Sequence, residues 1–369
     1  MRRMYIHQLK QWPDFQWDNA KIASLLSNVR HRQGRLLGRM EGLGFDLKEE
    51  ATLRTLTMDV LKSSEIEGEM LNPDQVRSSI ARRLGMDVAG LIPADRNVEG
   101  VVEMMLDATQ RYTAPLTDDR LFGWHASLFP AGRSGMYKIV TGAWRNNKRD
   151  DPMQIISGAM GREKVHFQAP DSDKLGSEMK KFLRWFNAAG NIDPVLKAAV
   201  AHLWFVTIHP FGDGNGRIAR AITDMLLARA DGSVQRFYSM SAQIRIERNG
   251  YYDILERTQK DTLDITAWIV WFLECLERAI GATDVTLAAV MRKAKFWEIA
   301  ATQTLNERQK LMLNKLLDGF IGKLTSSKWA TITKTSQDTA IRDIQDLVGK
   351  GLLRKEDAGG RSTSYILNE

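Results

Sequence analysis

The residues best suited to chemistry lie together in segment 209–220, which reads His-Pro-Phe-Gly-Asp-Gly-Asn-Gly-Arg-Ile-Ala-Arg. Its three glycines alternate with other residues, which lets backbone N–H groups converge, and the helix expected after them adds the positive end of its dipole. Arg217 and Arg220 are three residues apart, so both project from one face of the first helical turn. Two arginines this close indicate phosphate binding. The segment therefore predicts a binding site for a di- or triphosphate.

Two further side chains in the segment suit the transfer of a phosphoryl group. Asp213 offers a hard oxygen for Mg²⁺, and His209, at the start of the loop, is placed to take a proton from an incoming hydroxyl. Competing motifs do not fit. A dinucleotide fingerprint needs glycine where Arg217 stands, an EF-hand needs glycine where Ile218 stands, and the sequence holds no Gly-Lys-Ser/Thr phosphate loop.

The segment resembles the signature of the Fic family, His-Pro-Phe-x-Asp/Glu-Gly-Asn-Gly-Arg-x-x-Arg, and matches it at every position. Members of that family are mostly helical and transfer AMP from ATP to a protein hydroxyl with Mg²⁺, releasing pyrophosphate. The roles that the resemblance implies are general base for His209, loop anchor for Phe211, Mg²⁺ ligand for Asp213, α- and β-phosphate binding for Gly214, Asn215 and Gly216, and outer-phosphate binding for Arg217 and Arg220.

A second motif lies near the N-terminus. Ser63 and Glu67 are four residues apart, on one face of a helix expected at about residues 53–68 and ending at Gly68. The spacing alone is common on solvated helices, but beside the Fic signature it resembles that family's inhibitory motif, Ser/Thr-x-x-x-Glu-Gly/Asn. The resemblance implies that Glu67 pairs with Arg220 and keeps ATP out of line for transfer.

Two other features gain a role from the resemblance. Residues 135–170 break the helical pattern and predict a hairpin, which matches the flap that pairs with the target by strand addition in the family. An ordinary surface hairpin stays open as the alternative. The expected flap residues are Ile155, Ile156 and Ser157.

Tyr251 and Tyr252 resemble residues that lie near the adenine and ribose in the family, or they are core aromatics.

Helices must position this site. Apolar periodicity predicts helices over 53–61, over 196–206 and over 218–226, the second beginning at the cap Asp193-Pro194. The first of these belongs to an N-terminal helical region, 1–95, which carries the inhibitory helix. A mainly α-helical Fic core over 96–285, with its β-hairpin flap, follows.

The C-terminal part changes character. An amphipathic stretch at 311–320, a polar segment at 326–332 and a helix at 336–348 precede two strands around a Gly359-Gly360 turn. This order predicts a winged-helix domain over 291–369. Within its last helix, the residues expected to face inward are Ile341, Ile344 and Leu347.

Charge is unevenly distributed along the 369 residues, whose length suits two or three domains. The net charge is +7, while residues 291–369 hold 14 Lys and Arg against 9 Asp and Glu. A basic module indicates nucleic-acid contact or a solvated basic surface, and both stay open. The side chains available to phosphates are Lys328, Lys334, Arg342 and Arg361, and those opposing them are Asp338, Asp343 and Asp346.

Composition narrows the setting of the protein. Cys275 is the single cysteine, which excludes a disulfide framework and fits a reducing compartment. The longest apolar run, 265–273, is too short to span a membrane, and no signal peptide is visible. We expect a cytoplasmic protein.

The leading interpretation is a self-inhibited protein AMP-transferase that uses ATP and Mg²⁺. Its target is a protein with a Ser, Thr or Tyr hydroxyl, the chain itself included, and a homodimer is compatible with the sequence. Two alternatives stay open. One is removal of AMP, with Glu67 positioning a water, and the other is a nucleotide-sensing regulator that binds DNA through the winged helix.

Overall fold

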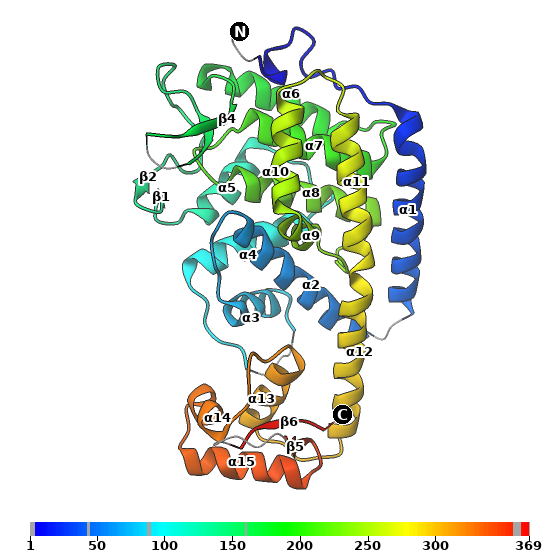
Figure 1. Cartoon of the computed structure of the whole chain (residues 1–369), viewed down its shortest axis with the longest axis vertical. Coiled ribbons are helices and arrows are strands. Elements are labelled where there is room, and N and C mark those ends of the chain that lie inside the picture. The colour runs from blue at the N-terminus through cyan, green and yellow to red at the C-terminus, as the bar shows by residue number, and fades with distance from the viewer. Residues whose placement is uncertain (1–3, 43–44, 87–89, 159–160, 357–362, 369) are drawn as a thin grey trace. The chain divides into compact units, whose positions relative to one another are not determined.

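The computed structural model describes residues 4–42, 45–86, 90–158, 161–356 and 363–368. The chain forms two compact units, one of residues 1–80 with 93–284 and one of residues 81–92 with 285–369. Both are mainly helical, and each sheet is a small antiparallel hairpin (Figure 1). Within the described ranges, no helix is both long and apolar enough to cross a membrane.

The first unit is built around α7 and α8, which pack against each other in its middle (Figure 1). Almost every side chain of α7 is buried, which is typical of a helix that is apolar on all sides. At one side of the unit α1 and α11 run together (Figure 1). The helices that lie in this unit or begin in it are η1 (Ile6–Gln8), α1 (Asn19–Glu41), α2 (Phe45–Ile66), α3 (Pro73–Arg83), α4 (Arg96–Gln110), α5 (Asp118–Leu128), η2 (Ser172–Lys174), α6 (Leu175–Asn187), α7 (Pro194–Ile208), α8 (Asn215–Asp231), α9 (Met240–Ile246), α10 (Arg248–Gln259), α11 (Thr266–Gly281) and α12 (Thr283–Ala300).

Local signals explain where these helices begin and end. The cap predicted for α7 is confirmed, because the carboxylate of Asp193 accepts a hydrogen bond from the backbone N–H of Val195 at 2.8 Å. In contrast, α8 begins at Asn215, before the stretch 218–226 over which periodicity predicted a helix. Gly214, its N-cap, has a left-handed φ of 78° and no capping side chain, so the usual sequence signal is missing.

The segment predicted to form a hairpin holds three strands. Strand β2 (Tyr137–Lys138) pairs with β1 (Arg133–Ser134), and β3 (Gln154–Ser157) pairs with β4 (Lys164–Gln168), with a bulge beside Ile156. Phe167 of β4 packs edge-on against Tyr5, with ring centroids 5.1 Å apart. The expected flap residues, Ile155, Ile156 and Ser157, are consecutive on β3.

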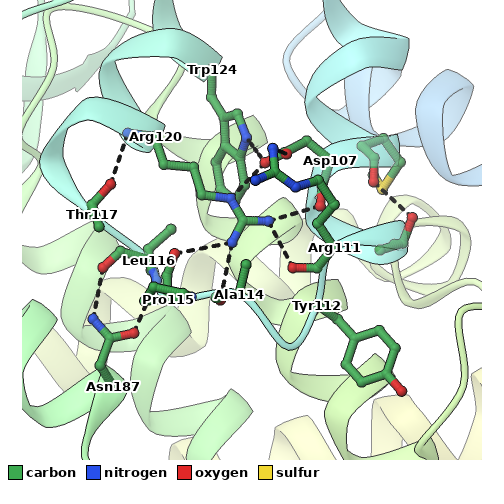
Figure 2. Close-up of polar contacts among 12 residues, drawn as sticks. Asp107, Arg111, Tyr112, Ala114, Pro115, Leu116, Thr117, Arg120, Trp124 and Asn187 are labelled. Carbon is green, nitrogen blue, oxygen red and sulfur yellow. Dashed lines mark hydrogen bonds and ion pairs between the residues drawn. The ribbon is translucent and has the colours of Figure 1, made fainter.

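Arg120 fixes the connection from α4 to α5. Its guanidinium donates to the Asp107 carboxylate at 2.6 Å and to the backbone oxygens of Asp107 and Arg111 at 2.8 and 3.1 Å, as Figure 2 shows. The indole of Trp124 donates to the same carboxylate at 2.7 Å. These bonds hold α5 in place, and α5 carries aromatic residues that support the loop at 209–220.

The second unit has the predicted order of helices followed by a strand pair. Its remaining elements are α13 (Glu307–Leu317), α14 (Ser326–Thr333), α15 (Gln337–Gly349), β5 (Leu353–Lys355) and β6 (Tyr365–Leu367). The prediction for Ile341 is wrong, because that side chain is 37% exposed, whereas Ala340, Ile344 and Leu347 form the buried stripe. The Gly359-Gly360 turn lies outside the described residues.

Candidate active site

The loop between α7 and α8 is held at its start by Arg145. His209 ends α7 in a left-handed conformation, with φ 51°, and its carbonyl accepts a hydrogen bond from Nε of Arg145 at 2.7 Å. The backbone N–H of Arg145 donates to the carbonyl of Pro210 at 2.9 Å, and a second guanidinium nitrogen donates to that of Pro170 at 2.5 Å. Arg145 thus joins the loop to the base of the β3–β4 hairpin. Arg145 lies within residues 135–170, for which the sequence predicted a hairpin, but the sequence analysis assigned it no role.

Phe211 anchors the middle of the loop in the core. Its ring is fully buried and stacks on the imidazole of His125 of α5 at 4.2 Å between centroids. The side chain of Asn215 closes the loop, since its oxygen accepts from the backbone N–H of Phe211 at 3.0 Å and its nitrogen donates to the Phe211 carbonyl at 2.8 Å. Both polar ends of the Asn215 amide are therefore used inside the loop.

Two glycines of the segment leave room that no other residue would. A Cβ on Gly214 would lie 2.9 Å from the ring of Phe129, and its φ of 78° disfavours any side chain. A Cβ on Gly216 would lie 2.1 Å from Oε1 of Glu67. The missing side chain at 216 is thus what allows the Glu67 carboxylate to reach the first turn of α8.

The structure brings Ser63 and Glu67 onto Arg220. The guanidinium donates to Oγ and the carbonyl of Ser63, each at 2.9 Å, and to Oε1 of Glu67 at 2.7 Å. Arg220 is 2% exposed, and its Nη1 has no hydrogen-bond partner among the described residues. The buried cation is therefore held by two residues of α2 and the turn after it, with one nitrogen still available for an anion.

The other arginine of the motif also holds a carboxylate, which the sequence analysis missed. Arg217 donates to Oε2 of Glu69 at 2.6 Å and lies over the ring of Phe129, 5.1 Å from its centroid. Arg217 is nearly buried, whereas the Glu69 side chain is 47% exposed. The only available signal was that Glu69 follows Glu67 by two residues.

One turn presents both carboxylates. Helix α2 ends at Ile66, and Gly68, with φ 86°, donates its N–H to the Glu65 carbonyl at 3.1 Å. The N–H of Glu69 donates to the Ser64 carbonyl at 3.0 Å. These two bonds and the left-handed glycine make a Schellman motif, which ends the helix earlier than the predicted residue 68. We call residues 64–69 the inhibitory turn, after the family motif that Ser63, Glu67 and Gly68 resemble.

His209 is placed to act as a base. Burial, assisted by the cation of Arg145, lowers the pKa of His209 to about 4, so the imidazole is neutral at pH 7. Its Nδ1 lies 3.3 Å from the carbonyl oxygen of Val206, and a proton on Nδ1 leaves the lone pair on Nε2. A neutral imidazole with a free Nε2 can accept a proton from a hydroxyl.

Asp213 is a suitable ligand for Mg²⁺. One carboxylate oxygen accepts from the backbone N–H of Gly214 at 2.6 Å, and the other accepts from the hydroxyl of Ser134. Among the described residues, no three or more Asp, Glu, His or Cys side chains are grouped so that they could hold a metal ion by themselves. Mg²⁺ commonly binds one carboxylate together with substrate phosphates, and a single Asp213 beside an anion site fits that pattern.

The two tyrosines lie differently. Tyr251 is 2% exposed, and its hydroxyl pairs with Nε2 of His202 at 2.8 Å, so it is a core residue behind Arg220. Burial raises the pKa of Tyr251 well above its ordinary value, and the hydroxyl stays protonated. Tyr252 is half-buried beneath the guanidinium of Arg248, 5.2 Å from the ring centroid. Of the two, Tyr252 has the accessible ring.

Comparison with known proteins agrees with this geometry. Residues 115–227 match the Fic/DOC family, and residues 5–86 match a domain of unknown function, DUF4172. A curated relative, protein adenylyltransferase Fic of Culex quinquefasciatus, is 27% identical over 228 residues, 60% of this chain and 40% of the relative. The protein of the same name from Drosophila yakuba is 32% identical over 135 residues, 35% of this chain and 25% of the relative.

The chain thus spans less than half the length of these two relatives. Among solved structures, a Fic family protein from Desulfovibrio desulfuricans G20 has a TM-score of 0.52 at 19% identity, covering 95% of this chain and 97% of that one, which shows a shared fold. Residues 115–227 of the chain thus form a Fic/DOC segment that follows a DUF4172 segment, and the chain is distantly homologous to protein adenylyltransferase Fic.

Proposed function

We propose that the protein transfers AMP from ATP to a hydroxyl side chain of a protein and that the inhibitory turn suppresses this activity. The observation that carries the proposal is the pair of buried arginines at the start of α8, each holding a carboxylate where a phosphate would bind. The distant homology to protein adenylyltransferases supports the same reaction.

The residues divide the work. Backbone N–H groups of the first turn of α8 and the guanidinium groups of Arg217 and Arg220 bind the triphosphate. His209 accepts the proton of the target hydroxyl through Nε2 while that oxygen attacks the α-phosphorus and pyrophosphate leaves. Asp213 would hold Mg²⁺, which neutralises phosphate charge when bound.

The inhibitory turn competes with ATP for the same cations. Oε1 of Glu67 lies 2.7 Å from Arg220, and Oε2 of Glu69 lies 2.6 Å from Arg217. A triphosphate in the presence of these carboxylates meets negative charge and loses two of its cationic partners. Because phosphoryl transfer depends on alignment, displacement of the outer phosphates is enough to slow the reaction.

The test is incorporation of label from α-³²P-ATP in the presence of Mg²⁺. We expect little label with the wild type, clear label with Glu67→Gly, and none when His209→Ala is added to Glu67→Gly. Glu65→Gln is the matched control, because Glu65 lies in the same turn but pairs with Lys62 at 2.7 Å. Absence of label from every variant, with ATP binding demonstrated by calorimetry, would contradict the proposal.

A second candidate activity is the removal of AMP. The Glu67 side chain is 30% exposed, and only its Oε1 is bound to Arg220, so the other oxygen could orient a water for attack on an AMP ester. Release of AMP from a modified protein by the wild type, and its loss in Glu67→Gln, would favour this direction.

We also propose that the second unit is a winged helix, from its order of three helices and a two-stranded ribbon. Two of the acidic residues that would oppose DNA are engaged inside the unit. Asp343 accepts from Arg308 at 2.8 Å, and Asp346 pairs with Lys350 at 2.5 Å. Binding to random duplex DNA that weakens steeply with salt would favour a DNA-binding wing, whereas no binding at low salt would favour docking or dimerisation of proteins.

A further inference from the structure

A second group of chemically competent side chains lies on the hairpin, outside the motif of α8. Oγ of Ser157 on β3 lies 2.6 Å from Nε2 of His166 on β4. Nδ1 of the same imidazole lies 2.5 Å from Oε2 of Glu256 on α10. The serine and the carboxylate thus contact opposite nitrogens of one imidazole, in the order that serine nucleophiles require.

The charge on Glu256 decides which nitrogen carries the proton. Burial opposes ionisation, but the hydrogen bonds from Lys260 and His166 prevail and lower the pKa of Glu256 to about 2. Lys260, one helical turn away, binds the other carboxylate oxygen at 2.5 Å. An ionised carboxylate beside Nδ1 keeps the proton of a neutral imidazole on that nitrogen, so Nε2 is the acceptor for the Ser157 hydroxyl.

The hairpin leaves this serine accessible. Ser157 is the last residue of β3 and is exposed. Gly158 follows with φ 110°, and a Cβ there would lie 2.8 Å from the carbonyl oxygen of Arg162, so only glycine allows the chain to turn at that point. The side chains of His166 and Glu256 are each about a quarter exposed.

We infer that Ser157 is a nucleophilic serine, assisted by His166 and oriented by Glu256, and that it accepts acyl groups from activated esters. This activity goes beyond the proposed AMP transfer and uses none of its phosphate-binding or proton-accepting residues, although Ser157 is also one of the expected flap residues. Ser157 Oγ forms a bond to the carbonyl carbon while its proton passes to Nε2 of His166. The carbon–oxygen bond to the leaving group then breaks, and the leaving alcohol takes that proton. Water repeats the sequence and frees the acid.

The experiment uses the full chain with two probes, a fluorophosphonate and p-nitrophenyl acetate. We expect the fluorophosphonate adduct to map to Ser157, and p-nitrophenyl acetate to give a burst of p-nitrophenol. His166→Ala should slow both reactions by about 100-fold, which is the lower end of the rate enhancement that a general base contributes. Glu256→Gln should slow them by a smaller factor. Ser177→Ala is the matched control, because Ser177 is an exposed serine whose hydroxyl donates only to a backbone carbonyl, at 2.8 Å.

Three results would overturn the inference. The first is a fluorophosphonate adduct on another residue while Ser157 stays unlabelled. The second is reaction of Ser157→Ala with the two probes at the wild-type rates. The third is reaction of His166→Ala with them at the wild-type rates. Thermal unfolding of each variant separates lost reactivity from lost structure, and Glu256→Gln, which preserves size and shape, decides the case if His166→Ala is unfolded. The labelling needs no ATP, so its failure says nothing against AMP transfer.

Discussion

The contact between Glu69 and Arg217 leads to a prediction that the family motif alone does not make. If both carboxylates of the inhibitory turn hold phosphate-binding arginines, removal of Glu67 frees only one of them. We therefore expect Glu67→Gly to be partly inhibited still, and Glu67→Gly with Glu69→Gln to transfer AMP faster than either single variant.

The size of each effect follows from the geometry. A hydrogen bond to a charged group contributes about 1.5–3 kcal/mol, and solvent screening reduces this for an exposed partner. Because Glu67 is 30% exposed and Glu69 is 47% exposed, we assign about 2 kcal/mol to the first contact and about 1 kcal/mol to the second. At 1.4 kcal/mol for each factor of ten, these correspond to about 30-fold and about 5-fold, and to about 150-fold together.

The assay is the initial rate of AMP incorporation as a function of ATP concentration, with the ATP dissociation constant measured separately. Glu69→Gln should tighten ATP binding about 5-fold. It should do so in the wild-type and the Glu67→Gly backgrounds, because the two pairs involve different arginines. The reasoning would be refuted if Glu69→Gln changed neither the rate nor the affinity in the Glu67→Gly background while Glu67→Gly itself was active. Glu69 would then be an ordinary surface ion pair.

Three other predictions concern single residues. Asn215→Ala removes both bonds to Phe211 and should lower the free energy of unfolding by about 2 kcal/mol, measured with urea. The pKa of His209, lowered from 6.5 to about 4, means that the folded state resists protonation, so stability from this residue is complete above pH 6.5 and is lost as the pH falls towards 4. The rate of AMP incorporation, measured as a function of pH, should accordingly show no fall from protonation of His209 between pH 8 and pH 6. Gly68→Ala places a side chain at φ 86°, a cost of about 1 kcal/mol that should loosen the inhibitory turn and raise AMP incorporation about 5-fold.

Spacing along the chain predicted the local parts of the site. Periodicity and a cap signal placed α7 correctly, since Asp193 and Pro194 act on their own neighbours. The start of α8 was placed late, because the helix begins after a glycine that provides no capping side chain. Ile341 was placed on the wrong face, because the buried stripe of α15 runs through Ala340 instead.

Long-range pairs were beyond the reach of spacing. Arg217 and Glu69 are 148 residues apart, and nothing in their neighbourhoods shows that a carboxylate outside the motif reaches this arginine. The pairing of Glu67 with Arg220 was expected only through the resemblance to a family. His166 was not singled out at all, because its partners come from another strand and from α10. Such sites depend on how elements pack, which periodicity does not encode.

In the proposed mechanism, inhibition and stability are linked through Arg220. An anion site made from buried cations is costly when empty, because an unpaired buried charge lacks the solvation it has in water. Glu67 supplies the missing negative charge when no nucleotide is bound, so its removal should activate the protein and destabilise it at once. Ser63 still contacts the guanidinium, and we expect a loss of about 1–2 kcal/mol, less than for a fully buried pair.

This link can be measured by thermal unfolding of the wild type and Glu67→Gly with and without ATP. Without nucleotide, the melting temperature of the variant should be several degrees lower, since each kcal/mol of lost stability lowers it by about 2–4 °C. ATP should raise the melting temperature of the variant more than that of the wild type. The larger gain follows because ATP phosphates replace the lost carboxylate in the variant, whereas in the wild type they must displace it. Equal shifts with ATP in both proteins would show that Glu67 and the phosphates do not share Arg220, and the competition on which the inhibitory mechanism rests would be wrong.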